Sequence, residues 1–189
     1  CSFFISKMKG VGKIATTGIW KIEKRLDNVI DYTTNIEKTI NGDYGKDSYY
    51  DLHNVIDYVE ADYKTEKQFY VSGVNCNPKT ALEEMTITKE QYGKTGGILG
   101  FHAFQSFAEG EVTPEQCHAI GVRLAEEMWG DRFEVVVSTH LNTNHYHNHF
   151  VINSVSFKDG KRYYDKRETY AELRRLSDSL CEEYGLSVL

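Results

Sequence analysis

Proline, tryptophan and paired cysteines are scarce in this sequence of 189 residues, and it has no long apolar run. There are 2 Pro, 2 Trp and 4 Cys, and no two of the cysteines (Cys1, Cys76, Cys117 and Cys181) form a C-x-x-C pair. This spacing excludes a zinc ribbon and a small disulfide scaffold, and it favours a reduced, cytoplasmic setting. No stretch approaches the roughly 18 apolar residues that a membrane span needs, so we expect no membrane partner.

An overall excess of basic residues is also missing. Lys and Arg number 22 against 28 Asp and Glu, which gives a net charge of −6 and argues against a uniformly basic nucleic-acid-binding surface. A local basic patch remains possible, because the segment 158–175 holds seven basic residues and four acidic ones. That segment is the best candidate for contacts with phosphates, and a solvated helix face is the alternative.

The composition, with 40% hydrophobic and 26% charged residues, is typical of one globular domain. We expect residues 1–14 to be an N-terminal remnant or extension. Residues 15–189 are then one domain, which we expect to be the N-terminal part of a longer protein.

Segments rich in β-branched and aromatic residues alternate with segments of helical periodicity. Strands are predicted over 15–22, 69–74, 101–107, 133–139 and 149–157. Helices are predicted after the first strand, through Leu26, Val29, Ile30 and Thr33, and over 79–92, 113–130 and 169–184. Because these elements lack strict βαβ spacing, the predicted fold class is α+β, with a central antiparallel sheet flanked by helices.

A short internal echo lies in the first third of the chain. The sequence Asn28-Val-Ile-Asp-Tyr32, followed by Lys38-Thr39, recurs 26 residues later as Asn54-Val-Ile-Asp-Tyr58, followed by Lys64-Thr65. Two copies are too few for a solenoid. The segment 41–50 between them is rich in Gly, Asp and Tyr and is predicted to be a loop.

Four of the seven histidines fall within residues 140–149. Side chains alternate across a strand, so His147 and His149 must point to the same face, and His140 ends the preceding strand. If the two strands pair as neighbours, three imidazoles can converge on one cation and leave open positions for a substrate oxygen. We therefore predict a metal site at His140, His147 and His149. A surface cluster of histidines without function is the alternative.

His145 lies within the same run and is open to two interpretations. It is either a fourth metal ligand or a residue that contacts the ligands without binding the metal itself. We favour the supporting role.

Three motifs together carry a resemblance to a known family. They are the strand and helix with Asn28–Tyr32 and Lys38-Thr39, the segment His102–Phe107 with Gly110–Glu115, and the run from His140 to His149 that continues into Phe150–Asn153. The chain resembles the relaxases of the MobA-like (MOBP) class, which are mobilisation nucleases of plasmids and transposons within the HUH endonuclease superfamily. The resemblance runs from Ala15 to Leu189 and implies an HUH-endonuclease-like fold.

The resemblance also implies a chemistry. In this family a tyrosine cuts one DNA strand at an origin of transfer and stays linked to the 5′ phosphate, while three histidines hold a divalent cation, most often Mn²⁺ or Mg²⁺. The matching histidines here are His140, His147 and His149. For the nucleophile we favour Tyr32, which follows the first strand directly as the family's nucleophile does. Tyr58, from the second copy of the echo, stays the alternative.

The same resemblance implies single-stranded origin DNA as substrate, with accessory mobilisation proteins and a coupling protein as partners. A phenol has a pKa of about 10 and needs activation, which a cation at the histidines can help to supply. His102, Gln105 and Ser106 are candidates to line the site or contact DNA, and a purely structural role is equally open for them. The alternative functions are an HUH replication initiator or transposase, and a non-catalytic DNA-binding module whose metal supports the fold.

Overall fold

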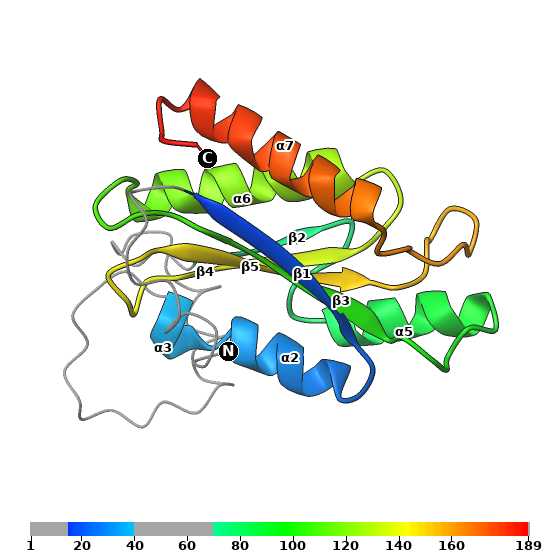
Figure 1. Ribbon diagram of the computed structural model, residues 1–189. Coiled ribbons are helices and arrows are strands. Elements are labelled where there is room, and N and C mark those ends of the chain that lie inside the picture. The colour runs from blue at the N-terminus through cyan, green and yellow to red at the C-terminus, as the bar shows by residue number, and fades with distance from the viewer. Residues whose placement is uncertain (1–14, 40–69, 189) are drawn as a thin grey trace.

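The computed structural model describes residues 15–39 and 70–188, and within these ranges five strands form one antiparallel sheet (Figure 1). In spatial order the strands are β1-β3-β5-β4-β2, and every neighbouring pair is antiparallel. Their bounds are Thr16–Ile22 for β1, Val71–Val74 for β2, Gly100–Ser106 for β3, Val135–His140 for β4 and His147–Asn153 for β5. The predicted antiparallel sheet is confirmed.

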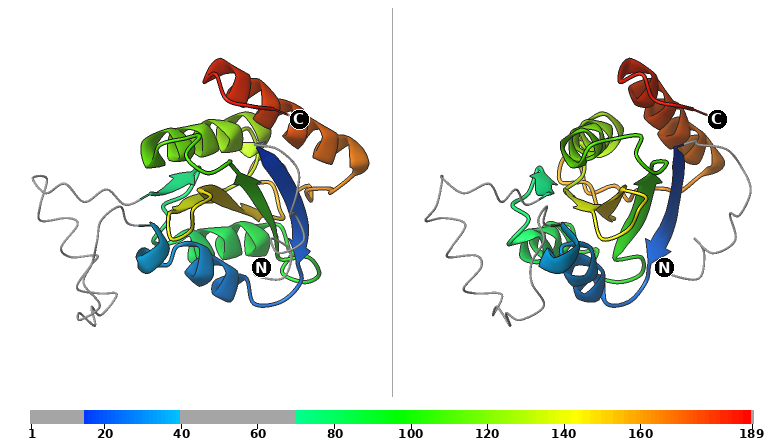
Figure 2. Two further views of the ribbon diagram at one scale, coloured as in Figure 1. Left: turned by 60° about the vertical axis from the view of Figure 1, so that its left-hand side comes forward. Right: turned by 90° about the vertical axis from the view of Figure 1, so that its left-hand side faces the viewer.

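Helices cover both faces of this sheet, as Figures 1 and 2 show. Helices α6 and α7 lie on one face, and α2, α3 and α5 lie on the other. The bounds are Leu26–Thr33 for α2, Ile36–Thr39 for α3, Ala81–Gln91 for α5, Pro114–Trp129 for α6 and Arg167–Glu183 for α7. The α+β class is therefore confirmed as three layers. Within the described ranges, no helix is both long enough and apolar enough to cross a bilayer.

Local sequence signals explain several element boundaries. At the start of α6, Thr113 accepts a hydrogen bond from the Gln116 N–H, and the Gln116 side chain accepts one from the Thr113 N–H, so the predicted capping box is present. The strand predicted over 149–157 instead spans 147–153. It ends at Asn153 because its neighbour β3 begins at Gly100, the residue opposite Asn153. The predicted loop 41–50 and Tyr58 lie outside the described residues.

The central strands β3, β4 and β5 bury side chains on both faces, because each face of the sheet is covered by helices. Beneath α6 and α7 the core includes Phe101, Phe150, Ile152, Leu124 and Trp129. The opposite face packs a smaller cluster against α2 and α5, made of Ile22, Leu26, Ile30, Ala81, Met85, Val136 and Val151. On this face of β4 the smaller cluster includes Val136, and the next two residues along the face, Ser138 and His140, are polar and buried.

A polar network on the α6 face joins β2, β4 and α6 through His118. Its Nδ1 lies 2.9 Å from Thr139 Oγ1, and its Nε2 lies 2.7 Å from Ser72 Oγ. The Thr139 hydroxyl already donates to Asn148 Oδ1, so its oxygen accepts from the Nδ1–H of His118. His118 is therefore held as the neutral tautomer whose Nε2 accepts from Ser72. Burial lowers the pKa of His118 from 6.5 to about 4.

We expect this histidine to make stability depend on pH. Because its folded pKa lies below its unfolded pKa, its contribution is present above pH 6.5 and is lost as the pH falls towards 4. The contribution is about 1–3 kcal/mol. Urea titration gives the free energy of unfolding of the natural protein and of His118→Gln. The difference between the two should become smaller as the pH falls from 6.5 towards 4. A difference that stays constant from pH 7 to pH 4 would contradict this assignment.

Candidate functional site

The pairing of β4 with β5 brings three histidines together on the face that carries α2 and α3. His140 lies directly opposite His147, and Ser138 lies opposite His149. The ring centroids are 5.2 Å apart for His140 and His147, 4.3 Å for His140 and His149, and 4.9 Å for His147 and His149. One nitrogen from each ring can be chosen so that all three lie within 4.8 Å of one another. This is the convergence that strand parity predicts.

Each of the three imidazoles has one nitrogen engaged in a hydrogen bond. His140 donates from Nε2 to the Thr33 carbonyl at 2.9 Å, and His147 donates from Nδ1 to the His145 carbonyl at 2.9 Å. His149 Nδ1 lies 2.9 Å from Nε2 of His102. The opposite nitrogens, Nδ1 of His140 and Nε2 of His147 and His149, are left for a ligand. The Nε2 of His149 is buried and has no hydrogen-bond partner among residues 15–39 and 70–188.

Burial keeps these imidazoles neutral. It lowers the pKa of His140 and of His102 to about 4, that of His149 well below its ordinary value, and that of His147 in the same direction. A neutral imidazole is the form that ligates a metal. Three neutral nitrogen donors, one of them buried without a partner, fit a divalent cation that keeps open positions for other ligands.

Tyr32 reaches this site from the last turn of α2. Its ring centroid lies 5.8 Å from that of His140 and 6.2 Å from that of His149, both edge to face. The side chain is 43% exposed, so its hydroxyl is accessible to a large substrate. The hydrogen bond between His140 and the carbonyl of Thr33 fixes the end of α2 to β4. The same histidine that faces the cluster therefore also positions the helix that carries the tyrosine.

The other candidates from the sequence are distributed over both faces. His102 is 3% exposed, lies against His149, and stacks edge-on with Trp20 at 4.4 Å. Ser106 is paired with His147 across β3 and β5 and shares its face. Gln105 points the opposite way, where its amide donates to Ser177 at 2.8 Å, so the structure does not bring it to the histidines.

His145 contributes through its backbone. Its side chain is exposed and lies outside the histidine cluster, while its carbonyl accepts the hydrogen bond from His147. A supporting role for His145 stays a prediction, and the contact that the structure gives it towards His147 is made by its backbone.

Sequence reasoning gave no role to Lys38, yet its ammonium nitrogen lies 3.3 Å from the centroid of the Tyr32 ring. The available signal was the echo, in which a Lys-Thr pair follows the tyrosine at the same distance in both copies. The spacing alone could not show that the lysine returns to the tyrosine, because this depends on how α3 is attached to the sheet.

Comparison with known proteins adds independent findings. The model of the MobA/VirD2-like relaxase nuclease domain matches residues 58–186, which include the three histidines and exclude Tyr32. Two Staphylococcus aureus proteins named Protein rlx are 43% identical over 117 residues and 40% identical over 126 residues. These matches cover 62% and 67% of this chain, and 37% and 39% of the relatives.

A third relative is the group II intron-interrupted relaxase LtrB of Lactococcus lactis, 28% identical over 207 residues, covering 88% of this chain and 36% of LtrB. The matches thus span less than two fifths of these curated relatives. Among solved structures, one described as the molecular basis of vancomycin resistance transfer in Staphylococcus aureus aligns with a TM-score of 0.58. It covers 93% of this chain and 96% of that one at 12% sequence identity, so the likeness concerns the fold.

Proposed function

This chain belongs to the family of MobA/VirD2-like relaxase nuclease domains, and we propose that it nicks one DNA strand at an origin of transfer. The observation that carries the proposal is the juxtaposition of Tyr32 with the three histidines, a nucleophile beside a set of metal ligands. A replication initiator or transposase is disfavoured because the matching family and the named relatives are relaxases. Mobilisation with accessory proteins and a coupling protein belongs to the same proposal.

The proposed metal ligands are His140, His147 and His149, with Mn²⁺ or Mg²⁺ as the ion. A divalent cation bound there supplies charge that polarises a non-bridging oxygen of the scissile phosphate. His102 has a positioning role in this scheme. To offer Nε2 to a metal, His149 must carry its proton on Nδ1 and donate it to Nε2 of His102, so His102 selects the ligating tautomer.

The proposed nucleophile is Tyr32. Its hydroxyl oxygen attacks phosphorus, the phenolic proton leaves to water, and the bond from phosphorus to the 3′ oxygen breaks. The 3′ oxygen takes up a proton and leaves as a free hydroxyl, while the 5′ side stays bonded to the tyrosine. The number of phosphoester bonds is unchanged, so the strand can be rejoined by the reverse attack.

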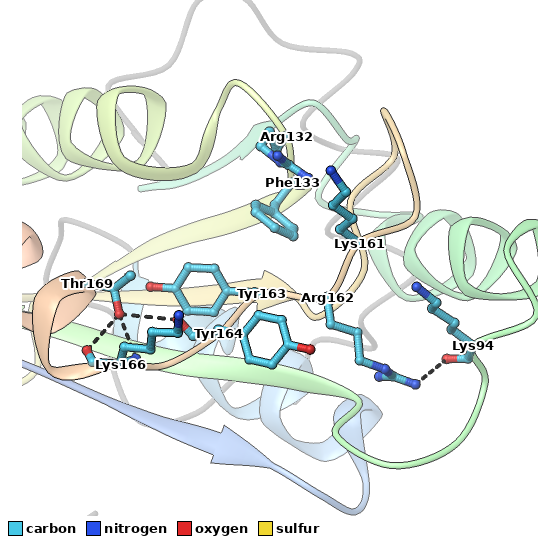
Figure 3. Close-up of a pocket in the computed structure, with 9 residues that line it drawn as sticks. All are labelled: Lys94, Arg132, Phe133, Lys161, Arg162, Tyr163, Tyr164, Lys166 and Thr169. Carbon is cyan, nitrogen blue, oxygen red and sulfur yellow. Dashed lines mark hydrogen bonds between the residues drawn. The ribbon is translucent and has the colours of Figure 1, made fainter.

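A second contact with DNA is proposed at the basic segment 158–175. Figure 3 shows the pocket there, lined by basic and aromatic side chains: Lys94, Arg132, Phe133, Lys161, Arg162, Tyr163, Tyr164, Lys166 and Thr169. Tyr164 is strongly exposed and offers a ring for base stacking. The pocket lies at the start of β4, whereas His140 ends that strand, about 20 Å away. A strand of several nucleotides is needed to contact both.

Metal binding gives the first test of this proposal. His149→Ala should weaken Mn²⁺ binding beyond detection in a calorimetric titration, because it removes the buried ligand. His102→Ala should weaken it by about 10- to 100-fold, the usual cost of losing the group that orients a ligand. His145→Ala is the matched control and should bind as the natural protein does, since its carbonyl is retained. Equal affinity in all three variants would refute the ligand assignment.

The nucleophile is tested by removing one oxygen. Tyr32→Phe should abolish the covalent 5′-phosphotyrosyl adduct, detected by gel shift of labelled origin DNA under denaturing conditions. Binding of Mn²⁺ and of DNA should persist, because the ring is retained. Tyr58→Phe should still form the adduct. The reverse pattern, with the adduct kept in Tyr32→Phe and lost in Tyr58→Phe, would assign the chemistry to the second copy of the echo.

The pocket is tested by the salt dependence of DNA binding. In the double variant Lys161→Gln, Lys166→Gln, the slope of log affinity against log salt for single-stranded origin DNA should fall by about 1.4, which is two phosphate contacts. Arg123→Gln is the control, because this guanidinium lies on α6, outside the segment 158–175 and the pocket, and is paired with Glu183 at 2.8 Å. A slope that changes equally in both proteins would show that the pocket is not a specific contact.

A further inference from the structure

The backbone of α3 is attached to the strand that carries the first histidine. The N–H of Leu141, the residue after His140, donates to the carbonyl of Lys38 at 2.7 Å. The next carbonyl, that of Thr39, accepts from the N–H of Tyr70 at 3.0 Å, and Thr39 is buried. Two successive residues of α3 are therefore held by the sheet. This fixes the origin of the Lys38 side chain beside the histidine site.

The ammonium of Lys38 lies against the face of an aromatic ring. Its nitrogen lies 3.3 Å from the centroid of the Tyr32 ring, and it makes no hydrogen bond or ion pair with any residue of 15–39 and 70–188. An ammonium has three donors, and a ring face satisfies none of them as an oxygen would. Partial burial lowers the pKa of Lys38 from its ordinary value. The group is thus a half-buried cation with unused hydrogen-bonding capacity.

In the part of the chain that the structure describes, the charge of Glu37 acts on Lys38, but Glu37 is exposed on α3 and is not part of the histidine cluster. Among the described residues, the metal-ligand cluster consists of histidines alone, without a carboxylate. The positive charge of Lys38 acts electrostatically on all three imidazoles, and it contributes to lowering the pKa of His140, His147 and His149. Three neutral imidazoles, one ammonium and a divalent cation together leave a strong positive charge. A phosphodiester is the anion that would compensate it.

We propose that Lys38 is a substrate-binding residue, which binds a non-bridging phosphate oxygen of the DNA strand where that strand crosses the histidines. In the DNA-free protein its ammonium rests on the Tyr32 ring and keeps the ring over the site. When a strand binds, the ammonium exchanges the ring face for a phosphate oxygen only a short movement away. This inference rests on the proposed function, because it requires a DNA strand at the histidine site.

The test uses the full chain and a single-stranded origin oligonucleotide. In Lys38→Met the slope of log affinity against log salt should fall by about 0.7, the loss of one phosphate contact on a single strand. Cleavage in a single turnover should slow by about tenfold or more, as expected for a lost hydrogen bond to a charged group. Lys38→Arg should retain the slope and most of the rate. Mn²⁺ affinity should be unchanged or slightly higher in Lys38→Met, because a nearby positive charge is gone.

A neutral methylphosphonate placed at each phosphate around the nick locates the contact. At one position it should weaken binding to the natural protein and leave binding to Lys38→Met unaffected, since the two changes remove the same interaction. Lys24→Met, which alters an exposed lysine between β1 and α2, is the control and should keep the natural slope. If Lys38→Met folds poorly, as judged by circular dichroism, Lys38→Gln replaces it.

The results separate the two proposals. If the natural protein neither binds nor cuts the origin strand, the proposed function is wrong. If the natural protein cuts while Lys38→Met keeps its slope and rate, or Lys24→Met loses as much slope as Lys38→Met, the function stands and the role of Lys38 is overturned. Additive effects of Lys38→Met and every methylphosphonate would also overturn it.

Discussion

The antiparallel register between β4 and β5 is the constraint on which the site depends. It sets His140 opposite His147 and places His149 two residues along the same face. A shift of one residue would turn a strand's side chains to the other face and disperse the three imidazoles. Correct pairing of two short strands therefore decides whether the three imidazoles converge at all. The apolar pattern of β4 contributes to this register, but it cannot be the only determinant, because both faces of these strands are buried.

Polar groups on the far face specify the same register. Asn148 lies between the two ligands of β5 and points away from them, towards α6. Its Oδ1 accepts from Thr139 at 2.6 Å, and its amide donates to the carbonyl of Cys117 at 2.8 Å and to Gln105 at 3.1 Å. A β carbon on Gly121 would lie 2.5 Å from the Asn148 amide nitrogen, so the absence of a side chain there provides the room. A slipped strand would bury these groups without partners, which is costly.

Much of this arrangement follows from sequence, and the exceptions have identifiable causes. Parity along 147–149 predicts the shared face of the histidines, and the capping residues Thr113 and Gln116 predict the start of α6. Strand order does not follow from local patterns, because β3 reaches β5 only through a long-range pairing. Sequence favours Tyr32 over Tyr58 only by its place directly after the first strand, since the echo makes their local sequences alike. The structure describes Tyr32 beside the histidines, and Tyr58 lies outside the described residues.

The two ends of β5 differ in how far their buried polar groups are hydrogen-bonded. At Asn153 a buried lysine and a buried glutamate each have hydrogen-bond partners. The Lys89 ammonium donates to Asn153 at 2.6 Å and to the carbonyl of Met85 at 3.1 Å, and Asn153 donates to Glu134 at 3.0 Å. Burial lowers the pKa of Lys89 to about 8, yet none of these groups is left over, as expected for polar residues that tie α5 to the sheet.

At the other end of the same strand, not every buried polar atom is hydrogen-bonded, and the atoms left over lie on the face that carries the histidines. His149 has its Nδ1 engaged with His102, whereas within the described ranges its buried Nε2 and the buried hydroxyl of Ser138, directly opposite, have no hydrogen-bond partner. An unpaired buried polar atom lowers the stability of the fold, so its presence calls for an explanation such as binding of a ligand. Both ends of β5 are rich in polar residues, so composition alone does not tell which end is the candidate site. Nε2 of His149 lies beside two further imidazoles, with the Tyr32 ring next to them and Lys38 on that ring. This atom distinguishes the end of β5 at which we expect chemistry.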